Sequence, residues 1–173
     1  VSPAADDETI TGVLVDSGAR VVIAEGYETV RMLWRIRARI RDVAKVVQID
    51  GDYPDERVLP LEGLLALGRD HLEAQPRALS QRLYAVRRRG LAALPYAVVD
   101  GIRRGVRLSH SALTYQATAL ASLGRLSGAD LLYLPVPMES MYAQAVLGVQ
   151  LACGFPIALE GGGDRVTDSL ATV

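Results

Sequence analysis

The feature that most constrains this chain is its alternation between short apolar runs and segments with the apolar spacing of an amphipathic helix. The runs typical of buried strands are RVVIAEG (20–26), KVVQIDGD (45–52), LAALPYAVV (91–99), DLLYLPVP (130–137) and FPIALEGG (155–162). Pro95 interrupts the third run and weakens its prediction as one continuous strand. The alternation predicts an α/β fold, with a mainly parallel sheet flanked by helices.

The segments between these runs have helical spacing. They are ADDETITGVLVDSGA (5–19), YETVRMLWRIRARIRDV (27–43), LEGLLALGRDHLEAQ (61–75), SHSALTYQATALASLG (109–124), ESMYAQAVLGVQLACG (139–154) and DRVTDSLATV (164–173). Gly18 and Gly154 stand where helices should end, and Ser109 or Ser111 is suited to an N-cap. These signals place most helix boundaries.

Length and charge limit the classes of protein to which this chain can belong. A chain of 173 residues can bury one good core, so we expect a single α/β domain over 1–173. A net charge of -1 gives no general attraction to nucleic acid or to anionic membranes. Cys153 is the only cysteine, the N-terminus lacks an apolar signal core, and no run approaches the roughly 20 apolar residues of a membrane span. We expect a cytoplasmic protein without a transmembrane segment.

The segment VVDGIRRGV (98–106) is a candidate phosphate loop. Its candidate binding residues are Gly101, Arg103, Arg104 and Gly105. Glycines let backbone N–H groups approach an anion, and arginines supply positive charge. The aliphatic side chains of the segment are bulky and offer no hydroxyl. From the residues alone, an ordinary surface turn is therefore the favoured alternative.

An arginine-rich stretch, RMLWRIRARIR (31–41), is a second candidate. Arg31, Arg35 and Arg39 follow one another at i, i+4 spacing and would form one stripe on a helix. Such a stripe could contact the phosphates of nucleic acid or of lipid headgroups. The favoured alternative is a solvated helix face, because the chain as a whole is not basic.

Two further groups of side chains are of types that can bind a metal ion or act in catalysis. The first is the acidic group Asp50, Asp52, Asp55 and Glu56. It could bind a divalent cation, but a solvated turn is favoured because Pro54 interrupts it and no ligand pattern is present. The second comprises His71, His110 and Cys153, which have no metal-ligand spacing and are expected to be structural. We therefore predict no metal ligands.

Several segments, in order, resemble one family. They are IAEGYETVRMLWRIR, VVQIDGD, LPLEGLLALGRDHLEAQPRALSQRLYAVRRRGLAALPYA, GVRLSHSALTYQATAL and LLYLPVPMESMYAQAVLGVQLACGFPIAL. Together they are similar to the AMP-forming acyl-CoA synthetases, and the third is similar to their long-chain fatty acid branch. The resemblance covers nearly the whole chain and rests on the ordered series of segments.

This resemblance implies both a fold and an activity. Family members have a large N-terminal domain of sheets and helices and a small, mobile C-terminal domain. They activate a fatty acid with ATP, assisted by Mg²⁺, and transfer the acyl group to CoA. The chain resembles a fragment of the AMP-binding N-terminal domain of these adenylate-forming ligases, and the C-terminal domain is absent from it.

The candidate phosphate loop departs from the family pattern. The family loop reads Tyr-Thr-Ser-Gly-Thr-Thr-Gly-Arg-Pro-Lys-Gly-Val, with ten residues between Tyr and Val. This chain has nine residues between Tyr96 and Val106, and AVV replaces the start of the hydroxyl run. Arg104 stands near the family lysine and Gly105 matches the final glycine. Arginine is a poor substitute for lysine in a tight cradle, so the loop is a remnant of the family motif.

A second departure lies in LPVPMES (134–140). The family commonly has a histidine and an aromatic residue there, near its acyl and nucleotide pockets. Here Met138 takes the place of the histidine and Ser140 that of the aromatic. This departure affects the expected substrate pocket.

These observations predict a truncated and degenerate relative of a fatty acid–CoA ligase that is inactive alone. Its cofactors by resemblance are ATP, Mg²⁺ and CoA, and its substrate is a fatty acid. One alternative is a non-catalytic subunit that self-associates or completes a separately encoded ligase. A less favoured alternative is a nucleic-acid binder that uses the arginine-rich helix, so nucleic acid is not an expected partner.

Overall fold

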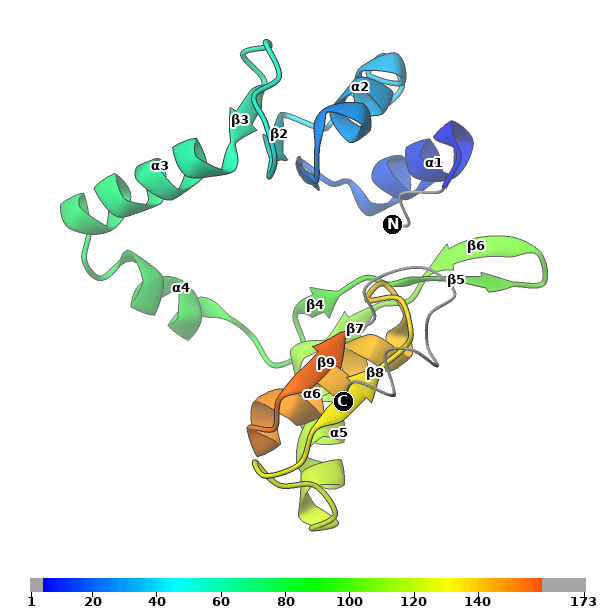
Figure 1. Cartoon of the computed structure of the whole chain (residues 1–173), viewed down its shortest axis with the longest axis vertical. Coiled ribbons are helices and arrows are strands. Elements are labelled where there is room, and N and C mark those ends of the chain that lie inside the picture. The colour runs from blue at the N-terminus through cyan, green and yellow to red at the C-terminus, as the bar shows by residue number, and fades with distance from the viewer. Residues whose placement is uncertain (1–4, 160–173) are drawn as a thin grey trace. The chain divides into compact units, whose positions relative to one another are not determined.

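The structure, a computed structural model, describes residues 5–159. The chain divides into two compact units, Val1–Val86 and Arg87–Val173, which are described in turn (Figure 1). The expectation of one domain over 1–173 stays a prediction. The predicted helix at 164–173 lies outside the described residues.

The first unit combines a small parallel sheet with helices. Its elements are α1 (Asp7–Ser17), β1 (Val21–Ala24), α2 (Tyr27–Arg35), β2 (Lys45–Gln48), β3 (Val58–Pro60), α3 (Leu61–Ala74) and α4 (Ala78–Ala85). The three strands pair in parallel in the order β1-β2-β3, with Val22 opposite Val46 and Val46 opposite Val58. This arrangement confirms the parallel pairing predicted for the first two apolar runs, whereas β3 and α4 were not predicted.

The termini of α1 follow from its sequence. The Asp6 side chain accepts a hydrogen bond from the Thr9 N–H at 2.8 Å and so caps the N-terminus. Gly18 ends the helix in a left-handed backbone conformation, as predicted. Ile10, Val13 and Leu14 are buried, which confirms the predicted apolar face.

The core of the first unit lies between the sheet and the helices. Its buried residues are Ile10, Leu14, Ala24, Val30, Leu33, Ile36, Ile40, Val46 and Val58. Burying one such aliphatic side chain stabilises a fold by roughly 1.5–3 kcal/mol. The prediction that the first apolar run is a fully buried strand is wrong, because Val21 and Ile23 are 56% and 66% exposed. Only one face of β1 is covered within this unit.

Helix α2 is shorter than its apolar spacing predicted. It ends at Arg35, and the backbone continues in tight turns in which Arg39 N–H donates to Ile36 O and Val43 N–H to Ile40 O. Ile36 and Ile40 are nevertheless buried at 4% and 6% exposure. Successive turns with hydrogen bonds between residues three apart thus place Ile36 and Ile40 on the same, core-facing side of the backbone, as a helix would.

The second unit contains paired strands and two long helices. Its elements are β4 (Leu91–Ala93), β5 (Tyr96–Val99), β6 (Ile102–Gly105), β7 (Leu108–Ser109), α5 (His110–Ser122), β8 (Leu132–Leu134), α6 (Met141–Cys153) and β9 (Ile157–Leu159). The pairs β4–β7 and β5–β6 are antiparallel, and β8–β9 is parallel. The predicted run 91–99 is split at Pro95 into β4 and β5, because proline cannot donate to a strand ladder.

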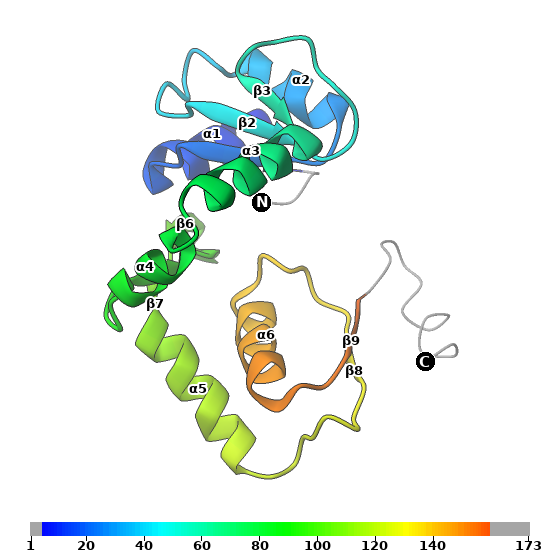
Figure 2. The ribbon, with the colours of Figure 1, turned by 90° about the vertical axis from the view of Figure 1, so that its left-hand side faces the viewer.

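Helices α5 and α6 pack against each other (Figure 2). A Cβ added at Gly148 of α6 would lie 3.7 Å from the Ala117 Cβ of α5, so small side chains allow this close approach. Ser109 Oγ caps α5 and Ser140 Oγ caps α6, accepting from the N–H three residues later at 3.2 and 3.1 Å. Gly154 ends α6 in a left-handed conformation, as predicted. The described chain is thus a mixed α/β structure with parallel strands flanked by six helices.

Candidate functional site

The candidate phosphate loop forms a β-hairpin. Strands β5 and β6 pair from Tyr96↔Gly105 to Val99↔Ile102, which leaves only Asp100 and Gly101 outside the ladder. Both turn residues have positive φ, 51° and 74°. This is the pattern of a two-residue type I′ turn, in which glycine adopts the left-handed conformation without steric strain. The sequence contains a signal for this turn, because Asp-Gly between apolar runs favours a hairpin. The prediction of a phosphate loop or surface turn did not use that signal.

The two arginines of the hairpin do not come together. In the ladder, Arg103 lies opposite Val98 and Arg104 lies opposite Ala97. Neighbouring residues in a strand point to opposite faces, so these guanidinium groups leave the hairpin on different sides. One anion bound on either face would therefore meet only one of them directly.

The two glycines of the candidate loop have different surroundings. A Cβ added at Gly101 would meet nothing within 4 Å, so the turn is open to solvent. A Cβ added at Gly105 would lie 3.1 Å from Leu94 Cδ1 and 3.3 Å from Tyr96 Cζ. Gly105 is therefore packed against side chains of its own unit. Phosphate binding by Gly101, Arg103, Arg104 and Gly105 stays a prediction.

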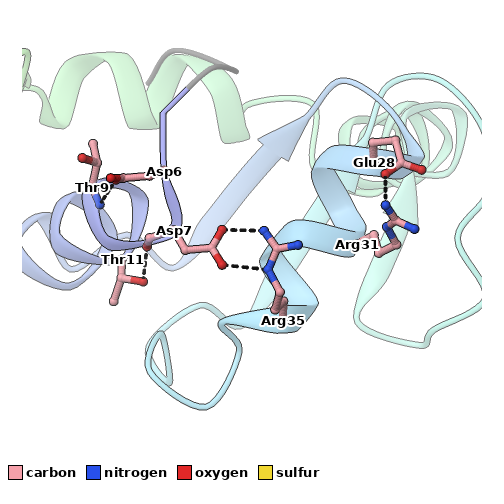
Figure 3. A network of polar contacts seen from close by, with 7 residues as sticks. All are labelled: Asp6, Asp7, Thr9, Thr11, Glu28, Arg31 and Arg35. Carbon is pink, nitrogen blue, oxygen red and sulfur yellow. Dashed lines mark hydrogen bonds and ion pairs between the residues drawn. The ribbon is translucent and has the colours of Figure 1, made fainter.

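The arginine stripe is neutralised within the first unit, and Figure 3 shows the ion pairs of Arg31 and Arg35. Arg35 donates two hydrogen bonds to the Asp7 carboxylate, from Nε at 2.7 Å and from Nη2 at 2.6 Å. Arg31 pairs with Glu28 at 2.6 Å, and Arg39 with a glutamate of α1 at 2.7 Å. Because α2 ends at Arg35, Arg39 lies in the following turns. Arg35 and Arg39 thus connect α1 to α2 and the turns after it, and their exposure agrees with the favoured alternative of a solvated face.

The contact between Asp7 and Arg35 shifts the pKa of both groups. The hydrogen bond from Arg35 lowers the pKa of Asp7 below its ordinary 3.8, and the same bond raises the pKa of Arg35. This bidentate geometry is the strongest form of such a pair. Both groups are solvent-exposed, so the pair orients α1 against α2 more than it stabilises the unit.

The acidic turn after β2 is organised by a buried amide. Gln48 is fully buried, its Nε2 donates to Asp50 O at 2.7 Å, and its Oε1 accepts from Tyr53 N–H at 3.0 Å. Asp55 accepts from Arg57 N–H and from Trp34 Nε1, both at 2.9 Å. The hydrogen bond from Arg57 N–H is the main cause that lowers the pKa of Asp55. These contacts make the segment a structured turn, and sequence reasoning missed the role of Gln48.

An aromatic cluster stands beside this turn. The Tyr53 ring lies 5.0 Å from that of Tyr27 and 5.6 Å from that of Trp34, between ring centroids. The guanidinium of Arg57 lies 5.0 Å from the centre of the Trp34 ring, a cation–π distance. Trp34 thus contacts the turn through its Nε1 hydrogen bond to Asp55 and through its ring contacts with Tyr53 and Arg57.

The two histidines and the cysteine lie on three different helices. His71 is exposed in the last turn of α3, His110 is half-buried at the start of α5, and Cys153 is half-buried at the end of α6. Across residues 5–159, no three His, Cys, Asp or Glu side chains are grouped so that they could hold a metal ion. Met138 and Ser140 flank the start of α6, where Ser140 acts as the N-cap.

Neither a protein-family model nor a curated protein sequence matches the chain. Solved structures do match. A long-chain-fatty-acid–CoA ligase from Archaeoglobus fulgidus superposes with a TM-score of 0.70 at 17% identity, over 99% of this chain and 31% of that one. The anthranilate–CoA ligase AuaEII, solved with anthranoyl-AMP, gives 0.73 at 20% identity, over 98% and 31%.

A third structure locates the match. The N-terminal domain of FACL13 from Mycobacterium tuberculosis superposes with a TM-score of 0.58 at 18% identity, over 99% of this chain and 40% of that one. The chain has the fold of part of this N-terminal domain. It therefore shares the fold of adenylate-forming CoA ligases, as the sequence resemblance implied, and spans about a third of the length of the ligases above. No described helix is long and apolar enough to cross a membrane.

Proposed function

We propose that the chain is part of a fatty acid–CoA ligase relative of lipid metabolism, located in the cytoplasm, that has lost acyl adenylation. The observation that carries this proposal is the fold match over 99% of the chain to a long-chain-fatty-acid–CoA ligase. The ordered sequence segments that resemble the same family support it independently. The chain supplies the scaffold around the nucleotide loop, and in the family this scaffold serves ATP, Mg²⁺, CoA and a fatty acid.

The hairpin supports the loss of adenylation. A phosphate cradle needs several backbone N–H groups pointing at one anion, usually with a hydroxyl and a cation. In β5 and β6 the ladder continues up to the two-residue turn, so the strand N–H groups that pair across it are not available. Val98 and Val99 are 61% and 47% exposed and present methyl groups instead of hydroxyls. We infer that these residues do not fit the phosphates of ATP.

The magnitude of this loss follows from transition-state stabilisation. Acyl adenylation develops charge that positioned donors and cations must stabilise, and one such donor contributes on the order of 100- to 1000-fold in rate. The chain lacks the hydroxyl run, and Arg103 and Arg104 lie on opposite faces of β6. Several such losses together leave no measurable turnover.

The experiment is ATP–pyrophosphate exchange with palmitate and Mg²⁺, on the protein as its host makes it, with any sequence that flanks these 173 residues. We expect no palmitate-dependent exchange. A second variant replaces residues 97–105 with Thr-Ser-Gly-Thr-Thr-Gly-Arg-Pro-Lys-Gly, and a matched control carries the same ten residues in scrambled order. We expect ATP binding, measured by equilibrium dialysis, in the first variant and not in the control.

Each outcome bears on a separate part of the proposal. Robust exchange by the unmodified protein would contradict the loss of adenylation while leaving the ligase assignment intact. A grafted variant that keeps its circular-dichroism spectrum but binds ATP no better than the scrambled control would contradict the assignment of the scaffold.

Exposed apolar side chains in the second unit indicate that a further protein segment packs against this unit. Tyr115 is 76% exposed, Tyr142 63% and Leu151 83%. We propose that further ligase segments, in the same polypeptide or in a partner chain, cover these side chains. Size-exclusion chromatography with light scattering tests this on the 173 residues alone: a monodisperse monomer that binds no hydrophobic dye would contradict it.

A further inference from the structure

The first unit has a pocket that the proposed function does not use. Side chains from α2, the turns after it, β2 and the turn before β3 line this pocket. Its charged lining residues are Arg37, Arg41, Lys45 and Arg57. The remaining lining is Trp34 with aliphatic residues, and no aspartate or glutamate lines it. It is an open surface pocket rather than an enclosed cavity, because its space of about 380 Å³ includes open solvent and its four cationic residues are exposed.

This concentration of positive charge is local. The Val1–Val86 unit as a whole contains more acidic than basic residues. The arginines of the 31–41 stretch divide into two sets. Arg31, Arg35 and Arg39 pair with carboxylates, whereas the ion pairs recorded for residues 5–159 include none to Arg37 or Arg41. The second set is the one that faces the pocket.

Backbone carbonyls hold the pocket cations in place without neutralising them. Arg37 Nη1 donates to Trp34 O at 2.7 Å, Arg41 Nε to Ala38 O at 3.2 Å, and Lys45 Nζ to Glu56 O at 2.8 Å. A guanidinium has five N–H donors and an ammonium three, so each side chain keeps further donors. The fourth cation, Arg57, lies over the Trp34 ring and 3.6 Å from Asp55.

We propose that this pocket binds a phosphate group. A tetrahedral dianion accepts hydrogen bonds on several sides, and the planar forks of Arg37 and Arg41 match two of its oxygen atoms each. Lys45 adds a compact positive charge at the start of the central strand, β2. Three of the four cations have no ion pair to a carboxylate among residues 5–159, which exceeds what one carboxylate ligand needs, so a phosphate is the better match in charge. The group is carried by a free phosphate or pyrophosphate, or by a phosphomonoester lipid headgroup.

Trp34 makes the test direct, because it lines the pocket and is the only tryptophan of the chain. Tryptophan fluorescence of the full chain is titrated with inorganic phosphate and with pyrophosphate, at constant ionic strength maintained with chloride. We expect a saturable change. Arg37→Gln with Arg41→Gln is expected to weaken binding at least about tenfold, because it removes charge-assisted hydrogen bonds.

The matched control is Arg31→Gln with Arg69→Gln, which removes the same charge from exposed positions outside the pocket lining. This variant should keep the wild-type affinity. If both pairs weaken binding equally, the attraction is non-specific and the proposal is wrong. Arg37→Lys with Arg41→Lys keeps the charge but removes the guanidinium forks, and an intermediate affinity is expected from a folded variant with the native circular-dichroism spectrum.

The source of the phosphate is tested in parallel. The chain is sedimented with phosphatidylcholine vesicles that either contain or lack phosphatidic acid. Co-sedimentation that requires phosphatidic acid and is lost in the Arg37→Gln, Arg41→Gln variant assigns a lipid headgroup. A fluorescence response without co-sedimentation assigns a free phosphate, and the absence of both responses overturns the proposal.

Discussion

Gln48 is the residue whose replacement tests the packing of the first unit most directly. It ends β2, is completely buried, and holds the following turn through Asp50 O and Tyr53 N–H. Gln48→Leu keeps a side chain of similar volume but removes both hydrogen bonds, leaving Asp50 O and Tyr53 N–H without this partner. An unpaired buried donor or acceptor costs about 1–3 kcal/mol. Most of this cost comes from the Tyr53 N–H, because Tyr53 is half-buried. Asp50 is exposed, so water can reach its carbonyl.

The expected loss in the free energy of unfolding is therefore about 1–3 kcal/mol, against the roughly 5–15 kcal/mol of an ordinary domain. Urea unfolding followed by Trp34 fluorescence measures it, because this tryptophan lies in the same unit. The control Gln75→Leu changes an exposed glutamine at the end of α3 and should stay within about 0.5 kcal/mol of the wild type. A Gln48→Leu variant as stable as that control would refute the reasoning.

Two further variants test other features. Gly101→Val places a β-branched residue at φ 74° and should weaken the hairpin by about 1–2 kcal/mol, which is measured as a lower thermal midpoint of unfolding. Gly68 lies inside α3, and a Cβ added there would meet nothing within 4 Å. Gly68→Ala should therefore stabilise the helix by about 0.5–1 kcal/mol. Asp7→Asn should reduce stability at neutral pH and have a vanishing effect in acid. The pKa of Asp7 is lowered in the folded state, so its contribution is present above the ordinary 3.8 and is lost as the pH falls through the lowered value. Equal effects of Asp7→Asn at both pH values would show that the Arg35 pair is not the cause.

The sequence predicted helix ends and strand positions wherever one local signal decided them. Gly18 and Gly154 end helices because glycine readily adopts the left-handed conformation, and Ser109 caps α5 because its hydroxyl reaches a free N–H. The end of α2 could not be read in this way. Tight turns and a helix both bury Ile36 and Ile40, so the apolar spacing is the same for the two structures.

The candidate site was less predictable than the fold. The arginines at 31–41 form a single pattern in the sequence. Arg31 pairs with a glutamate of its own helix, but only the three-dimensional positions of the acids on α1 separate Arg35 and Arg39 from the set at the pocket. Arg57 joins that pocket from a segment 16 residues beyond Arg41, which no local spacing indicates. The hairpin differs, because Asp100 and Gly101 are a local signal for a two-residue turn and are sufficient to predict it from the sequence.

The order of the first sheet has a consequence for how the chain is made. In β1-β2-β3 the spatial order of the strands is also their order along the chain, so each strand pairs with one that has already left the ribosome. Each strand pairing that the structure describes in this sheet joins two strands of the first unit. Because synthesis proceeds at about 5–20 residues per second and units fold as they emerge, the first unit can complete its sheet while the hairpin is still being translated.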